Sequence, residues 1–225
     1  MDVIYDKASG GAKRVLLIML PGAKDRPQDF VEWGFIRALR ERNLAVDVVA
    51  VDAHIDYYFE QTIVERLRRD IIAPARAQGY EHICLLGISL GGMGCLRYLR
   101  EHPADIAGAV LLAPFLGSRG TIAEVTAAGG FQRWIPDSKV DDDERVFLAW
   151  LQAYPFHDPA SPKIYLGYGA DDRFAPASKL LAELLPPPHV AAMPGGHDWR
   201  TWLGLWVNLL DRKFFAHDEL PGPLT

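Results

Sequence analysis

Six short, nearly continuous apolar runs, separated by longer amphipathic segments, constrain the fold more than any other feature of this sequence. Runs of this kind are typical of strands buried on both faces of a parallel sheet. The predicted strands cover residues 14–21, 45–53, 83–89, 108–115, 163–169 and 189–194. Strands that alternate with helices imply right-handed crossovers, so we predict an α/β fold with a mostly parallel central sheet and helices on both faces.

Helical patterns fill most of the intervals between these runs. Helices are predicted over residues 29–43, 59–78, 92–101, 177–185 and 199–215. Pro74 should end or kink the second of them. The interval of about 117–162 is an exception, because it lacks a convincing strand and has helical patterns around 121–128 and 142–154. We interpret it as a small cap-like insertion in a single domain that spans residues 1–225.

Composition and charge exclude several kinds of partner. The 225 residues have a formal net charge of −5 and no sustained basic run, which argues against a nucleic-acid ligand. The first residues lack a signal-peptide pattern, and the longest apolar stretches are strand-sized, so we expect a soluble, cytoplasmic protein without a membrane span. Cys84 and Cys95 are interpreted as buried core residues rather than a catalytic or structural pair.

The motif GISLGG, residues 87–92, lies where a predicted strand becomes a helix. Gly87 and Gly91 leave room for a sharp turn that lifts the Ser89 hydroxyl above the sheet edge, and the following helix offers free backbone N–H groups. On its letters alone, the motif fits either a nucleophile or a small residue that a tight turn tolerates.

A serine hydroxyl needs a base, and His197 is the histidine best placed to serve. It lies in a glycine-rich loop after the last predicted strand, at the carboxyl end of the sheet that also receives Ser89. The base in turn needs an acid, and two neighbours, Asp171 and Asp172, follow the preceding strand. The spacing in residues 169–176, GADDRFAP, favours Asp172.

An oxyanion hole is expected from the backbone N–H groups of two residues. The first predicted strand ends in Pro21 and Gly22, where the chain can turn the N–H of Ala23 inward. The second donor is Leu90, the residue after the proposed nucleophile.

The order Ser89, Asp172, His197, together with GISLGG, GADDRFAP and the terminal GGHDW, resembles the α/β-hydrolase family over roughly residues 14–215. The resemblance implies the α/β-hydrolase fold with an eight-stranded or shortened sheet, no cofactor, and a covalent acyl-enzyme on Ser89. One departure is Pro21-Gly22 where the family often has His-Gly, which removes any side-chain contribution to the oxyanion hole.

These observations predict a serine hydrolase for a small carboxylic ester or thioester. We expect no metal site, and the oligomeric state stays open. An acyltransferase on the same fold and a non-catalytic binding module are the alternatives. Four aromatic residues of the insertion are candidates for an apolar wall around the substrate. They are Phe131, Trp134, Phe147 and Trp150.

Overall fold

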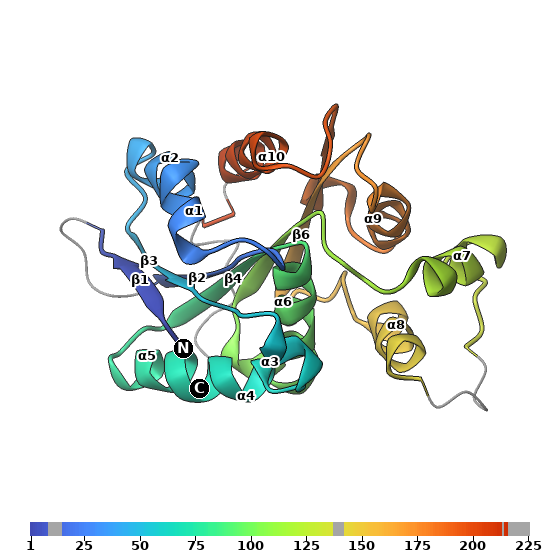
Figure 1. The fold of residues 1–225 in the computed structure, drawn as a ribbon, viewed down its shortest axis with the longest axis horizontal. Helices are drawn as coiled ribbons and strands as arrows, with labels where there is room; N and C mark the ends of the chain where they lie inside the picture. Colours follow the sequence, from blue (N-terminus) through green and yellow to red (C-terminus); the bar gives the residue numbers. More distant parts are fainter. Residues whose placement is uncertain (9–14, 137–141, 213, 216–225) are drawn as a thin grey trace.

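The computed structural model describes residues 1–8, 15–136, 142–212 and 214–215, and within them seven strands form one sheet (Figure 1). The strand order is β1-β3-β2-β4-β5-β6-β7. All neighbours pair in parallel except β1 and β3, which are antiparallel. The strands are β1 (Val3–Asp6), β2 (Val15–Leu20), β3 (Val46–Val51), β4 (His82–Ile88), β5 (Gly108–Leu112), β6 (Lys163–Gly169) and β7 (Val190–Met193). The predicted mostly parallel sheet is confirmed.

Each of the six predicted strands is present, and β1 is the strand that the sequence did not reveal. It has four residues, it lies at the sheet edge against β3, and Tyr5 in its middle is 59% exposed. An edge strand of this length has no continuous apolar run, so the pattern that identified the other strands is missing.

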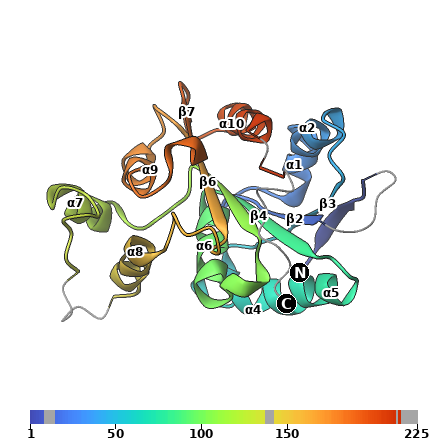
Figure 2. The same ribbon diagram turned by 180° about the vertical axis from the view of Figure 1, so that it is seen from behind.

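Helices cover both faces of the sheet, as predicted, and divide the core into two clusters (Figures 1 and 2). One face carries α1 (Pro27–Glu32), α2 (Phe35–Glu41) and α10 (Trp199–Asp211). The core of the other face is shared by α4 (Ile63–Leu67), α5 (Ala73–Ala77), α6 (Leu90–Glu101), α7 (Arg119–Ala127), α8 (Asp143–Ala153) and α9 (Ala175–Ala182), with the short α3 (Asp56–Phe59) packed against it. Two 3₁₀ turns, η2 (Pro103–Asp105) and η3 (Pro187–His189), complete the elements.

Two predicted helices are interrupted for local reasons. The segment predicted over 29–43 is split into α1 and α2 at Gly34, whose φ of +85° is not helical. The segment predicted over 59–78 contains a π-helical turn, η1 (Arg68–Ile72), between α4 and α5. Pro74 has no N–H and its ring crowds the preceding turn, and the wider π turn directly before it relieves that crowding.

The connection between β5 and β6 contains α7 and α8, where two helical pieces were predicted. Its large side chains pack inward, with Phe131, Trp134 and Phe147 all buried in the core of the second face. An ion pair between Arg145 and Glu124 joins α8 to α7. Residues 137–141 of the predicted insertion, and residues 14 and 213 at the ends of predicted elements, lie outside the described residues.

In the part of the chain that the structure describes, no helix combines the length and the hydropathy that crossing a membrane requires.

Candidate active site

Ser89 lies on a sharp turn between β4 and α6, with φ +52° and ψ −112°. A residue other than glycine rarely adopts a positive φ, and surrounding contacts must hold it there. Its backbone N–H donates to the Leu112 carbonyl at 2.9 Å, and its carbonyl accepts from the Phe115 N–H at 2.9 Å. The end of the neighbouring strand β5 therefore fixes the strained turn that presents Ser89.

Glycines at 87 and 91 are required by close backbone packing around this turn. A Cβ atom on Gly91 would collide with the Leu20 carbonyl and lie 2.6 Å from the Pro21 carbonyl oxygen. A Cβ atom on Gly87 would collide with the Gly91 carbonyl. The glycines thus allow α6 to begin directly against β4 and bring the end of β2 alongside Ser89.

Gly91→Ala is therefore expected to lower the free energy of unfolding by at least about 1–3 kcal/mol, because rigid carbonyl groups cannot yield to the added methyl group. Urea unfolding followed by circular dichroism measures this. Gly120→Ala is the matched control, since its Cβ would find its nearest neighbour, Ser118 Oγ, at 3.9 Å. Equal stability of the two variants would contradict the tight packing at Gly91.

The structure brings Ser89, His197 and Asp172 together from the carboxyl ends of β4, β7 and β6. The Nε2 atom of His197 is 3.0 Å from Ser89 Oγ, and its Nδ1 atom is 2.7 Å from Asp172 Oδ2. A neutral imidazole with its hydrogen on Nδ1 donates to the carboxylate and leaves Nε2 to accept the serine proton. The three side chains form one continuous hydrogen-bonded chain.

The two aspartates that the sequence left open occupy different environments. Asp172 is buried, and its second oxygen accepts from the Phe174 N–H at 2.7 Å. Asp171 is exposed and accepts from the Gly195 N–H at 3.3 Å, so it supports the loop that carries His197. Only Asp172 contacts the imidazole.

Two aromatic rings hold the imidazole of His197 in place. Phe174 and Trp202 each lie 4.9 Å from it between ring centres, in edge-to-face geometry. Such contacts restrict the rotation of the imidazole and exclude water from its sides.

Asp198 follows His197 and caps α10, because its side chain accepts from the Thr201 N–H at 3.0 Å. This N–H is the main reason that the pKa of the Asp198 carboxyl lies below its ordinary value. A lowered pKa in the folded state means that the carboxylate stabilises the fold above its ordinary pKa, and that this contribution is lost as pH falls through the folded-state pKa.

Asp198→Ala is expected to lower the free energy of unfolding by about 1 kcal/mol near neutral pH, and the deficit should shrink as pH falls below the ordinary aspartate pKa. Urea unfolding at a series of pH values measures both effects. Asp198→Asn is the control, because asparagine caps helices as well as aspartate but does not titrate. A deficit that is constant across pH would contradict the role of the charge.

The turn after β2 contains Ala23, one of the two predicted oxyanion donors, and it lies against Ser89. A Cβ atom on Gly22 would be 3.7 Å from the Ser89 Cβ. Among the hydrogen bonds of the described residues, the N–H groups of Ala23 and Leu90 have no acceptor. Trp199 Nε1 donates to Asp25 Oδ1 at 3.1 Å, and this bond ties the turn to the first residue of α10. The turn that carries the Ala23 N–H is thereby linked to the segment that follows His197.

The cysteines and the potential metal ligands of the described residues do not form a second reactive site. Cys84 and Cys95 are free and buried, and burial raises the pKa of the Cys84 thiol to about 12, so neither thiol resembles a reactive thiolate. Within the described ranges, no group of three or more histidine, cysteine or acidic side chains could hold a metal ion.

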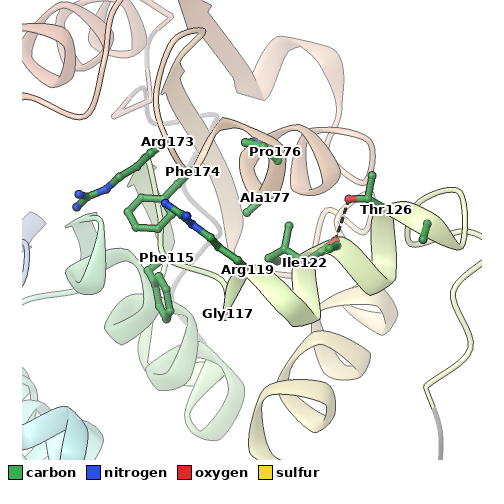
Figure 3. A pocket seen from close by; sticks show the side chains of 11 residues that line it. Phe115, Gly117, Arg119, Ile122, Thr126, Arg173, Phe174, Pro176 and Ala177 are labelled. Carbon is green, nitrogen blue, oxygen red and sulfur yellow. Dashed lines mark hydrogen bonds between the residues drawn. The ribbon is translucent and has the colours of Figure 1, made fainter.

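A cavity of about 680 Å³ lies between α7 and α9 (Figure 3), and two of its lining residues, Phe174 and Phe115, contact His197 and Ser89. Its lining includes Phe115, Arg119, Ile122, Arg173, Phe174 and Ala177. The aromatic candidates Phe131, Trp134, Phe147 and Trp150 do not line it, because the first three pack into the core and Trp150 packs against Tyr154. Sequence reasoning missed the lining residues, although Arg173 and Phe174 directly follow Asp172.

Comparison with known proteins assigns the fold. The structure is similar to an S-formylglutathione hydrolase from Staphylococcus aureus (TM-score 0.61, 15% identity, 91% of this chain and 83% of that one). It is also similar to a ferulic acid esterase (0.59, 14%, 93% and 96%) and to an α/β-hydrolase from the sediment metagenome of the Mar Chica lagoon, Morocco (0.57, 17%, 96% and 95%). The chain therefore has the α/β-hydrolase fold, with a sheet of seven strands in the described residues.

A family model also matches part of the chain. Residues 63–165 match the model described as serine aminopeptidase, S33, a stretch that contains Ser89 and ends before Asp172 and His197. The resemblance to α/β-hydrolases that the motifs indicated is confirmed. Among curated proteins, none matches the sequence significantly.

Proposed function

We propose that this protein is a serine hydrolase that cleaves a carboxylic ester or thioester through an acyl-enzyme on Ser89. The observation that carries the proposal is the hydrogen-bonded chain from Ser89 through His197 to Asp172, with the serine on a strained turn at the end of β4. A serine, a histidine and a buried carboxylate in this order of contact are the groups that nucleophilic acyl transfer requires.

The proposed reaction has two halves. His197 Nε2 takes the proton of Ser89 as Oγ attacks the carbonyl carbon, and the proton then passes to the leaving alcohol or thiol. A water molecule deprotonated by His197 attacks the acyl-enzyme and releases the acid. Asp172 holds the imidazole in the required tautomer and stabilises its protonated form.

The oxyanion of each tetrahedral intermediate would be bound by the N–H groups of Ala23 and Leu90. Both belong to turns that lie against Ser89, and neither N–H is engaged elsewhere in the described residues. A pre-positioned donor of this kind contributes about 2.7–4 kcal/mol to the stability of a transition state.

The comparisons support the class of reaction. Two of the similar structures are named for ester or thioester chemistry, an esterase of ferulic acid and a hydrolase of S-formylglutathione. The location of α7 beside the cavity fits the predicted role of the β5–β6 connection as a cap, and we propose that role here.

Labelling with a fluorophosphonate probe tests the proposal. Folded protein should form a covalent adduct that peptide mapping locates at Ser89, and it should hydrolyse p-nitrophenyl and thioester substrates. Ser89→Ala is the unlabelled control. Absence of labelling in folded protein would favour a binding module, whereas transfer of the acyl group to an added alcohol or amine in preference to water would favour an acyltransferase.

A further inference from the structure

The cavity between α7 and α9 is connected to the proposed catalytic residues through two phenylalanines. Phe174 lies 4.9 Å from the His197 ring, and the Phe115 N–H donates to the Ser89 carbonyl. The two rings contact each other at 5.7 Å between centres. One end of the cavity is therefore the catalytic end. Figure 3 shows Thr126 at the other end.

Apolar groups make up most of the cavity wall. Ile122 and Ala123 come from α7, and Pro176 and Ala177 come from α9. Thr126, the polar residue at the far end, uses its hydroxyl internally, because it donates to the Ile122 carbonyl at 2.8 Å. This part of the cavity suits an aliphatic or aromatic group.

Two arginines at the catalytic end differ from the rest of the wall. Figure 3 shows Arg119 reaching from α7 towards Phe174, and Arg173 beside the same ring. The Cζ atom of Arg173 is 4.9 Å from the Phe174 ring centre, the same spacing that separates this ring from His197. The cation is thus no more than two such spacings from the imidazole.

No carboxylate of the described residues pairs with either arginine. Among these residues, the cavity lining contains no aspartate or glutamate. Two guanidinium groups that no described carboxylate pairs with, beside an apolar cavity, form a site for an anion attached to an apolar body.

We propose that the preferred substrate is an ester that carries a carboxylate close to the ester carbonyl, held by Arg119 and Arg173, and an apolar group that fills the cavity between α7 and α9. The ester bond of this substrate rests on the proposed hydrolase function. The anion site rests only on the cavity and on the charges of Arg119 and Arg173. Guanidinium groups bind planar carboxylates through paired hydrogen bonds, so the anion also orients the ester.

A matched pair of esters tests the substrate class. Monoethyl benzylmalonate and diethyl benzylmalonate share one skeleton and differ in whether the second carboxyl group is free. The ratio of their kcat/KM values should fall at least about tenfold from wild type to Arg119→Gln/Arg173→Gln, which is the size expected from loss of a charge-assisted hydrogen bond. Because each ratio uses the same two substrates, their intrinsic reactivities cancel.

Arg37→Gln is the control for a general loss of positive charge. Arg37 is an exposed residue of α2, outside the cavity, and its replacement should leave the ratio unchanged within about twofold. The wild-type ratio should also fall as ionic strength rises, because exposed charge interactions are screened by salt.

A binding experiment separates this inference from the hydrolase proposal. In Ser89→Ala protein, calorimetry should show 3-phenylpropanoate binding at least about tenfold more tightly than the uncharged 3-phenylpropanamide, and Arg119→Gln/Arg173→Gln should abolish the difference. This preference, together with wild-type protein that fluorophosphonate does not label, would sustain the anion site and sink the hydrolase proposal. Hydrolysis of both esters with a kcat/KM ratio that does not fall in the double variant overturns the substrate class and leaves the hydrolase proposal intact.

Discussion

Ser89→Ala is expected to lower kcat/KM for an activated ester by at least about 10⁴-fold, with little change in stability. The Ser89 hydroxyl is the proposed nucleophile, and it lies 3.0 Å from His197 Nε2. The strained turn that carries it lies against the turn at Gly22. Steady-state hydrolysis of p-nitrophenyl esters measures the loss, and urea unfolding checks that the variant folds.

The interdependence of Ser89 and His197 sharpens this expectation. His197→Ala should cost about as much as Ser89→Ala, and the double variant should be no slower than either single variant, because groups that act as one unit are non-additive. Single losses that multiply in the double variant would mean that the two residues act separately, and would contradict the proposed proton transfer between them.

Asp172→Asn is expected to lower kcat by about 10⁴-fold. The replacement keeps the size of the side chain, but its amide can donate to His197 Nδ1. The imidazole then carries its hydrogen on Nε2 and cannot accept the proton of Ser89. The folded structure should persist, since the asparagine oxygen can still accept from the Phe174 N–H, as Asp172 does.

Asp171→Asn provides the matched control beside it. Asp171 is exposed and contacts the Gly195 backbone rather than the imidazole, so turnover should change by no more than about twofold. A large loss in Asp171→Asn together with a small loss in Asp172→Asn would reverse the assignment of the acid. Steady-state kinetics of both variants with one ester suffices.

The parallel strands could be predicted because their burial leaves a direct trace in the sequence. β2, β4 and β5 are covered on both faces, and each reads as an unbroken apolar run. Interruptions within the predicted helices could not be predicted in this way. The helical periodicity of the sequence extends across both the break at Gly34 and the π turn before Pro74, so it did not reveal either of them.

The candidate site was predictable to the extent that sheet topology determines it. Residues that follow parallel strands meet at one edge, so the motifs around Ser89 and His197 could be brought together without coordinates. The choice between Asp171 and Asp172 depended on which of two adjacent side chains turns inward, and the structure separates them by burial and contacts.

The cavity lining could not be predicted by the same reasoning. The aromatic residues of the β5–β6 connection have the composition of a substrate wall, but Phe131, Trp134 and Phe147 are used to hold α7 and α8 against the core. The wall is made instead by Phe115, Phe174, Ile122 and smaller residues, together with Arg119 and Arg173, and it depends on how α7 lies against α9.

The location of α7 has a consequence for how such a protein can diversify. Ser89, Asp172 and His197 are attached to strand ends that the sheet holds rigidly, whereas one wall of the cavity belongs to a helix inserted between β5 and β6. The wall that α7 contributes is thus encoded apart from the three strand ends, whereas Arg173 and Phe174 share a stretch with Asp172. Recombination or drift within α7 would therefore change one wall of the cavity while Ser89, Asp172 and His197 are inherited unchanged.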